Sequence, residues 1–395
     1  MKKSIVRILI ALFFAIPSLI FRMYGIQANP IILTIIYGSG IIVSAILLSW
    51  AAEAAQIDIS SSFAVAILAL IAILPEYAVD LYFSFNAGSQ PQFTHFAAAN
   101  MTGSNRLLIG IGWSAVVISF VIGRKLNGEK VNAITLLPKM RVELFFLGIA
   151  CLYSFVMPLF KKITLIDSIV LISLFFIYMF KVSSEKKGIP KLQGTAAGFK
   201  SLTKIQRFFS VNSLFLIATG LIFLAAKPFA DSLIASGRVL HFNEYLLVQW
   251  LAPIATEAPE LLVAIIYASR NKSNQAIGTL LSSKINQWTL LVGSIPIAYY
   301  LGGGGALGLP LDLRQNEEFI LTAAQSILGF AFLIDLHFSI KEAAILLGLF
   351  LIQFFLTGTE QRLILSGFYI LLGVILIIIR WKDIPLMFKS LIAKN

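Results

Sequence analysis

Twelve apolar stretches, most of them about as long as a helix that crosses a lipid bilayer, occupy most of this sequence. In hydrocarbon every backbone N–H and C=O group needs a partner within the chain, and an α-helix supplies those partners within one segment. The sequence therefore predicts an all-α membrane protein with about 12 transmembrane helices. The predicted spans are residues 4–22, 31–50, 60–86, 94–122, 142–159, 164–181, 208–226, 240–268, 274–300, 317–336, 340–357 and 363–380.

The charged residues support this class, because they make up only 13% of the 395 residues, whereas soluble domains carry about 25%. With a cytoplasmic N-terminus, twelve spans place 21 of the 31 Lys and Arg residues on the cytoplasmic side, 7 outside and 3 within spans. This asymmetry follows the positive-inside rule and explains the net charge of +12 without nucleic acid. We expect a multi-pass protein of the cell membrane with both termini cytoplasmic. Its expected partners are the lipid bilayer and small inorganic cations, with no nucleic acid and no protein partner.

The sequence lacks the motifs of an enzyme or of a resident cofactor. Cys151 is the single cysteine, and the histidines His95, His241 and His337 are scattered, so no Cys/His zinc pattern is present. The glycine run 302–305 lacks the Lys-Ser/Thr of a phosphate loop and is expected to be a flexible connector. We find no nucleophile–base pair, and we expect a protein that is not an enzyme and needs no cofactor.

Two Pro-Glu pairs inside apolar spans indicate an internal repeat. Pro75-Glu76 is followed in the next span by Gly103-Ser104-Asn105, and Pro259-Glu260 by Ser282-Ser283-Lys284. The first pair lies in the third span and the second in the eighth, so the two helices cross in opposite directions. Inverted repeats with interrupted helices are typical of secondary transporters, whose sites lie near the bilayer midplane.

This repeat predicts the organisation of the whole chain, with five helices in each repeat. The lysines at the N-terminus and the apolar run after them, without a clear cleavage site, favour an uncleaved first span. The predicted segments are an extra N-terminal transmembrane helix (1–30), a first repeat (31–182), a basic cytoplasmic linker (183–207), a second repeat (208–358), and an extra C-terminal transmembrane helix and tail (359–395).

The acidic side chains of Glu76, Asp80, Glu257 and Glu260 all fall well within apolar spans. A carboxylate in hydrocarbon is costly and usually faces a cavity or a partner. Pro75 and Pro259 each remove one backbone hydrogen bond, and the freed carbonyl needs a side chain, a water or an ion as partner. A carboxylate directly after such a proline favours a hard-oxygen site for Na⁺ or Ca²⁺. The alternative is an interhelical pair that only holds helices together.

Polar side chains at matching positions of the following spans extend both sites. They are Asn100, Ser104 and Asn105 in the first half, and Thr279, Ser283 and Lys284 in the second. Their oxygen atoms could complete the shell of a bound cation. The alternative for the serines is a packing role, because small residues allow helices in a membrane to approach closely.

These motifs resemble those of the cation/calcium exchanger superfamily, which includes the membrane region of sodium/calcium exchangers. Its first motif has the form Gly-Thr-Ser-x-Pro-Glu, and its second Gly-Asn-x-x-Gly-Ser-Asn or Gly-Ser-Asp. The resemblance covers the second to the eleventh span and implies ten helices in two inverted halves, which exchange Ca²⁺ for Na⁺ or H⁺. It implies a cation site formed by Glu76, Glu260, Thr256, Ser104, Asn105, Asn100 and Ser283. The residues expected around these ligands are Asp80, Pro75, Pro259 and Arg106.

The sequence departs from the family pattern at several ligand positions. Ala72-Ile73 replaces the Thr-Ser of the first motif, Glu257 replaces a Ser, and Lys284 stands where Asn or Asp is expected. A pair between Glu257 and Lys284 would balance an added acid with an added base. Two alternatives stay open: a static buried salt bridge, or a built-in cation that fills one ion position or supplies the exchanged proton.

The sequence thus predicts a secondary active cation antiporter that works by alternating access at a midplane Glu/Ser/Asn site. The transported cations are Ca²⁺ or another cation against Na⁺ or H⁺. One alternative is a carrier of a different solute that uses Lys284 and Arg106. Another is a non-transporting membrane scaffold or sensor that retains the fold.

Overall fold

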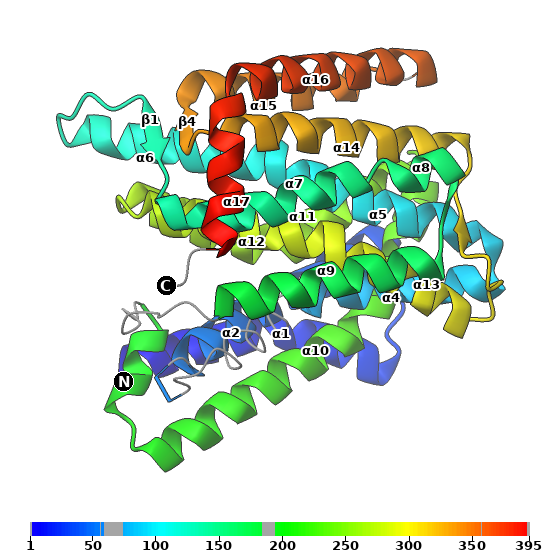
Figure 1. Cartoon of the computed structure of the whole chain (residues 1–395). Helices are drawn as coiled ribbons and strands as arrows, with labels where there is room; N and C mark the ends of the chain where they lie inside the picture. Colours follow the sequence, from blue (N-terminus) through cyan, green and yellow to red (C-terminus); the bar gives the residue numbers. More distant parts are fainter. Residues whose placement is uncertain (1, 56, 59–73, 184–193, 357, 393–395) are drawn as a thin grey trace. The chain divides into compact units, whose positions relative to one another are not determined.

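The computed structural model describes the chain except for residues 1, 56, 59–73, 184–193, 357 and 393–395 (Figure 1). It consists mainly of helices, as the sequence predicts. The α-helices are α1 (Lys2–Tyr24), α2 (Pro30–Ala55), α4 (Leu74–Ser89), α5 (Thr94–Leu107), α6 (Ser114–Leu126), α7 (Arg141–Tyr153), α8 (Val156–Phe160), α9 (Leu165–Ser183), α10 (Lys204–Val239), α11 (Glu244–Ser269), α12 (Ser273–Asn286), α13 (Val292–Leu301), α14 (Leu313–Leu333), α15 (Ile340–Ile352), α16 (Thr359–Ile379) and α17 (Ile384–Ile392). Two short π-helices are η2 (Leu108–Trp113) and η5 (Gln287–Leu291). The 3-10 turns are η1 (Pro91–Phe93), η3 (Pro138–Met140), η4 (Ala196–Ser201), η6 (Gln353–Phe355) and η7 (Trp381–Asp383). The strands are β1 (Ala133–Thr135), β2 (Lys162–Ile163), β3 (Leu309–Pro310) and β4 (His337–Ser339).

Within the described residues, seven helical stretches are long and apolar enough to cross a membrane. An eighth is α11, in which Glu244–Ala258 and Glu260–Ser269 form a bent pair. The predicted number of 12 is therefore met only in part by length and composition. The seven stretches are Lys2–Tyr24, Pro30–Ala55, Pro91–Leu126, Pro138–Phe160, Leu165–Val182, Lys204–Val239 and Thr359–Ile379.

The four remaining predicted spans differ from these stretches for identifiable reasons. The span at 60–86 lies largely outside the described residues, and only its end, α4, is described. The spans at 274–300 and 317–336 are helical but contain buried polar side chains, and the helix at 340–357 has only 13 α-helical residues, in α15. A helix enclosed by protein can carry polar groups that lipid would not accept. The linker predicted at 183–207 lies partly outside the described residues as well.

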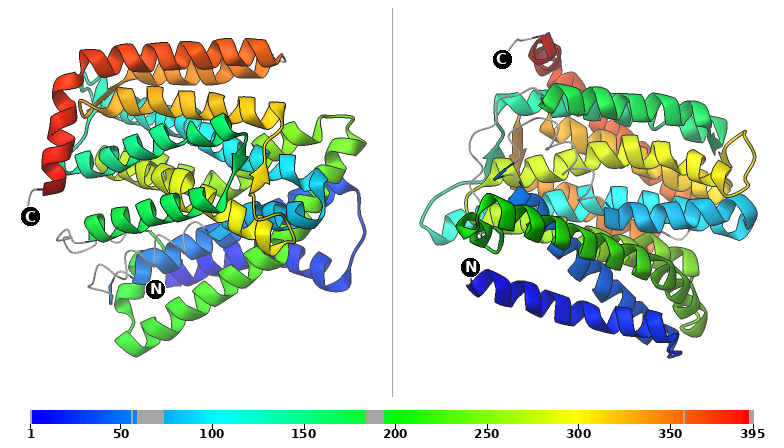
Figure 2. Two further views of the ribbon diagram at one scale, coloured as in Figure 1. Left: turned by 45° about the vertical axis from the view of Figure 1, so that its right-hand side comes forward. Right: turned by 90° about the horizontal axis from the view of Figure 1, so that it is seen from below.

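The helices divide into two compact units, and each unit takes residues from both predicted repeats. Unit 1 comprises Met1–Phe83 and Met179–Pro259, and unit 2 comprises Ser84–Tyr178 and Glu260–Asn395. In unit 1, α1, α2 and α10 lie side by side (Figures 1 and 2). The Thr34 hydroxyl of α2 joins α10 through hydrogen bonds of 3.2 and 3.0 Å to Ser232 and Ser236.

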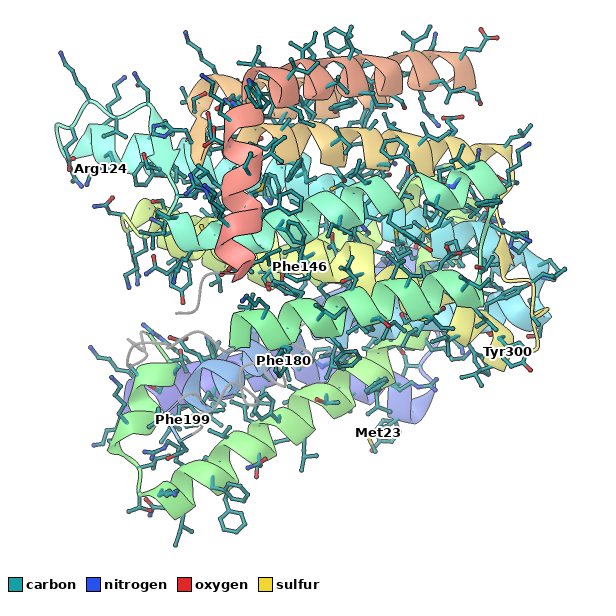
Figure 3. All side chains as sticks on the ribbon, in the orientation of Figure 1. Met23, Arg124, Phe146, Phe180, Phe199 and Tyr300 are labelled. Atoms are coloured by element: carbon teal, nitrogen blue, oxygen red, sulfur yellow. The ribbon has the colours of Figure 1, made fainter. Side chains whose placement is uncertain are left out.

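Unit 2 is built around α14, which packs against α5, α7 and α16. Most of the α14 side chains are buried. Outside the cores of the units, large apolar side chains such as Met23, Phe180 and Tyr300 are exposed (Figure 3). Extensive apolar exposure is unusual for a soluble monomer. It is the expected surface of helices that face lipid.

Unit 2 contains the same order of elements twice. The series α5, η2, α6 and β1 in the first half corresponds to α12, η5, α13 and β3 in the second. Strand β1 pairs antiparallel with β4, and β2 with β3, so each small sheet joins one strand from each half of the chain. This order is consistent with the predicted internal repeat. The π-helices begin three residues after Asn105 and after Lys284, and such insertions often mark functional sites.

The glycine run 302–305 is packed at its start rather than flexible throughout. A Cβ atom on Gly302 would lie 1.8 Å from the carbonyl oxygen of Phe85, near the end of α4. A Cβ on Gly304 would lie 2.4 Å from the Tyr299 ring, whereas one on Gly305 would meet nothing within 4 Å. Gly302 therefore allows α13 and the end of α4 to touch.

We expect Gly302→Ala to destabilise the protein by about 1–3 kcal/mol, because the added methyl forces two backbones apart. Gly305→Ala is the matched control and should stay within about 0.5 kcal/mol of wild type. Melting temperatures of the purified proteins in detergent compare the two changes. Equal melting temperatures of the two variants would show that the contact at Gly302 is not tight.

Candidate functional site

The first Pro-Glu pair lies at the start of α4, in unit 1. Glu76 is in the first turn of this helix with 3% of its side chain exposed, and Asp80 follows one turn later and is fully buried. The i,i+4 spacing places both carboxylates on one face of the helix, as predicted. The predicted break at Pro75 involves residues 71–73, which lie outside the described part of the chain.

The second Pro-Glu pair lies at a bend in α11. The helical segments Glu244–Ala258 and Glu260–Ser269 meet at 57°, and a bend at this position is consistent with the backbone hydrogen bond that a proline removes. Thr256 and Glu257 are buried just before the bend, in unit 1. Glu260 follows the bend and belongs to unit 2.

Three oxygen atoms at motif positions of unit 2 are buried without a hydrogen bond of regular geometry to any described residue. They are Oε2 of Glu260, Oγ of Ser104 and Oγ of Ser283. The Ser283 hydroxyl nevertheless lies within interaction range of the Glu260 carboxyl group. Buried polar atoms are nearly always hydrogen-bonded, so these oxygens call for an explanation. Carboxylate and hydroxyl oxygens are hard ligands that can coordinate a cation.

Further polar groups lie at or beside these motif positions. Asn100 is buried on α5 one turn before Ser104. The Tyr178 hydroxyl of α9 donates a 3.1 Å hydrogen bond to the Ser282 hydroxyl of α12. The Tyr178 ring in turn packs against Phe146 of α7, with 5.5 Å between ring centres. Across the described residues, no group of three or more His, Cys, Asp or Glu side chains is placed to hold a metal ion.

Lys284 is fully buried in unit 2 and binds Asn105. Its Nζ donates to the backbone oxygen of Asn105 at 2.9 Å and to the side-chain Oδ1 at 2.6 Å. The two residues hold the third position of their triplets, one in each half of the chain. The sequence alone did not indicate this contact, although an inverted repeat brings equivalent positions into equivalent places. The predicted Glu257–Lys284 pair joins residues of different units and stays a prediction.

Arg106 takes part in a buried ionic network that the sequence did not reveal. Its guanidinium forms an ion pair with Glu318 of α14 and donates a 2.8 Å hydrogen bond to Oε1 of Gln353. Arg362 of α16 lies directly before the predicted span 363–380, and it is buried and donates to Glu317 at 2.9 Å and to Glu318 at 3.1 Å. The sequence feature that could have indicated this network is the adjacent pair Glu317 and Glu318 at the start of a predicted span.

This network bears on the alternative of a solute carrier. A guanidinium that is engaged by a carboxylate and an amide oxygen offers its donors to the protein rather than to a substrate anion. The Gln325 side chain also donates to the Arg106 carbonyl at 3.2 Å, which fixes the backbone directly after Asn105. The arrangement therefore favours a structural role for Arg106 beside the motif.

Comparison with known proteins agrees with this geometry. Residues 29–183 and 211–358 match the family model described as sodium/calcium exchanger protein. The chain is 39% identical to the H⁺/Ca²⁺ exchanger CAX, whose crystal structure it matches with a TM-score of 0.94 over 98% of each chain. A comparison with curated protein sequences found no match.

Two more distant structures share the fold. Native YfkE is 16% identical with a TM-score of 0.65, over 92% of this chain and 99% of that chain. The sodium-calcium exchanger NCX_Mj is also 16% identical, with a TM-score of 0.53 over 89% of this chain and 100% of that chain. The predicted resemblance and the predicted cation antiport are thereby confirmed, and the family consists of transporters. This multi-pass membrane chain belongs to the sodium/calcium exchanger protein family and is a cation antiporter.

Proposed function

We propose that this antiporter moves Ca²⁺ in exchange for H⁺. The observation that carries the proposal is the similarity to the H⁺/Ca²⁺ exchanger CAX, at 39% identity over 98% of both chains. The proposal treats Ca²⁺ and H⁺ as substrates and requires no resident cofactor and no protein partner.

Glu76 and Glu260 are the proposed central ligands. Each follows a proline in the predicted repeat, and each is a carboxylate in a span where lipid or protein surrounds it. Their two negative charges are balanced by one Ca²⁺ or by two protons. Exchange of one for the other leaves the net charge of the pair unchanged, so neither state buries an excess charge.

Hydroxyl and amide oxygens complete the proposed shell. The buried Oγ of Ser104 supports this assignment, because it lacks a regular hydrogen bond to any described residue, and the Ser283 hydroxyl lies beside the Glu260 carboxyl group. Asn100 and Thr256, both buried, are the further proposed ligands. Asn105 instead serves Lys284 in this proposal, because its Oδ1 accepts a hydrogen bond from the ammonium.

The remaining predicted residues support the site. Pro75 and Pro259 break their helices at the carboxylates, and the bend in α11 supports this role for Pro259. Asp80 extends the acidic face of α4, Glu257 balances the charge of Lys284, and Arg106 holds the motif end of α5 through Glu318.

Proton rather than sodium coupling follows from the residues that replace the family pattern. Ala72-Ile73 offers no side-chain hydroxyl, and Lys284 brings a positive charge where the family has an oxygen ligand. Both changes remove oxygen atoms that an alkali ion would need, whereas a proton binds to a carboxylate alone. The exchanger can therefore work with fewer ligands when H⁺ is the counter-ion.

We also propose the topology that the sequence predicts. It has 12 transmembrane helices, inverted repeats at 31–182 and 208–358, one extra helix at each end, and both termini in the cytoplasm. The site lies near the midplane and opens alternately to the two sides.

Uptake of radioactive Ca²⁺ into proteoliposomes tests the function. We expect uptake when the lumen is more acidic than the medium, and loss of uptake when a protonophore collapses the gradient. Vesicles with Na⁺ inside and equal pH on both sides should show only the leak of protein-free vesicles. Uptake driven by Na⁺ alone would contradict proton coupling, and no uptake in either case would contradict Ca²⁺ as the substrate.

A further inference from the structure

The ammonium of Lys284 is surrounded by groups that attract a positive charge. Two oxygen atoms of Asn105 lie within 2.9 Å of Nζ, and the Trp288 ring centre lies 5.2 Å from it. The face of an aromatic ring attracts a cation of any kind. The Trp288 N–H donates to the Ser326 hydroxyl at 2.9 Å, and this bond fixes the ring in position.

The Asn105 side chain is oriented independently of the lysine. Its Nδ2 donates a 3.0 Å hydrogen bond to the Met101 carbonyl one turn earlier on α5. The Oδ1 atom must therefore point away from Met101, as an acceptor. The backbone carbonyl of Asn105 lies at the end of α5, just before the π-helix η2. Both oxygens would thus remain available to a positive charge if Lys284 were shortened.

Burial of an ammonium is costly, and its retention requires compensating interactions. Here the lysine comes from the second half of the chain and its oxygen ligands come from the first. From this geometry we propose that Lys284 is a tethered cation which takes the place of a bound Na⁺. The residue thereby sets the ion specificity of the antiporter, since a permanently filled position needs no sodium. This inference deepens the proposed Ca²⁺/H⁺ exchange and explains why that exchange would not respond to Na⁺.

The test measures Na⁺ binding by the purified full-length protein, without any transport. Melting temperatures are compared in NaCl and in choline chloride for wild type, Lys284→Ala, Lys284→Met and Lys284→Arg. We expect no Na⁺ effect for wild type and for Lys284→Arg, which keeps the charge. Lys284→Ala should melt several degrees higher in NaCl, because an ion that binds only the folded state stabilises it. Lys284→Met fills the volume without a charge and should respond less than Lys284→Ala.

The proposal is overturned if Na⁺ raises the melting temperatures of Lys284→Ala and wild type equally, or raises neither. It is also overturned if the Ala and Met variants stay unfolded in both salts, because Na⁺ then cannot replace the ammonium. A second readout is Ca²⁺ uptake driven by a proton gradient, in which external Na⁺ should change the rate of Lys284→Ala only. Absence of uptake by wild type would refute the Ca²⁺/H⁺ exchange itself, and the melting experiment would still decide the role of Lys284.

Discussion

Replacement of Glu260 by glutamine should reduce Ca²⁺ uptake into proteoliposomes by at least ~100-fold, close to the leak of protein-free vesicles. Glutamine has nearly the same shape but lacks the charge that balances a divalent cation. Loss of one partner of a buried charge pair costs about 3–5 kcal/mol, and every 1.4 kcal/mol corresponds to a tenfold change in affinity. Glutamine also removes the group that would carry the proton in the return step, so both half-reactions should fail.

Glu76→Gln should have the same effect, because the repeat assigns the same role to this carboxylate. The matched control is Glu244→Gln, on the first turn of α11, where the carboxylate forms an exposed ion pair with Arg238. Exposed pairs contribute about 0–1 kcal/mol, so uptake by this variant should remain near wild type. Equal amounts of folded protein, measured by size-exclusion chromatography, separate loss of function from loss of fold. Normal uptake by both Glu76→Gln and Glu260→Gln would refute the assignment of the central ligands.

Features that depend on neighbours along the chain could be predicted from the sequence. The break at Pro259 follows from its missing N–H, and the structure places the bend there. The shared face of Glu76 and Asp80 follows from helical spacing alone. The helices themselves follow from apolar length, since hydrocarbon leaves the backbone little choice.

Features that depend on distant partners could not be predicted in this way. Lys284 and Asn105 are 179 residues apart, and Arg106 and Gln353 are 247 apart. The spacing of apolar and polar residues along one helix does not show which other helix it packs against. Glu318 lies at the edge of the predicted span 317–336, where a charged residue is expected to face water, but it is buried within the protein. A polar residue in a span indicates a partner without naming it.

Two of the predicted spans lack the length or the apolar composition of a membrane-spanning helix, and the reason is related. The helix α12 has 14 residues and is shorter than a full span, and α14 carries Glu317, Glu318 and Gln325 among its buried side chains. Their polar groups are enclosed in unit 2, where Glu318 binds Arg106 and Lys284 binds Asn105. The residues that weaken the hydropathy signal are therefore those that form the buried polar networks.

We expect Glu318→Gln to lower the free energy of unfolding by about 3–5 kcal/mol, because it leaves buried arginines with too little negative charge. The Glu318 carboxylate faces Arg106, Arg362 at 3.1 Å and Arg314 at 2.9 Å. Only Arg314 is substantially exposed among these three, so water can compensate only one of them. Thermal melting in detergent and the yield of folded protein measure the loss.

The control for this change is Glu129→Gln, which removes the partner of Arg124 in an ion pair where both side chains reach solvent. That variant should lose at most about 1 kcal/mol. In the double variant Arg106→Met with Glu318→Gln, both members of the buried pair are neutral, and Glu317 still pairs with Arg362. The double variant should therefore be more stable than Glu318→Gln alone, since removal of a whole buried pair costs less than removal of one partner. If Glu318→Gln has the same melting temperature as Glu129→Gln, the network does not stabilise the fold. Another group must then balance the positive charge of Arg106.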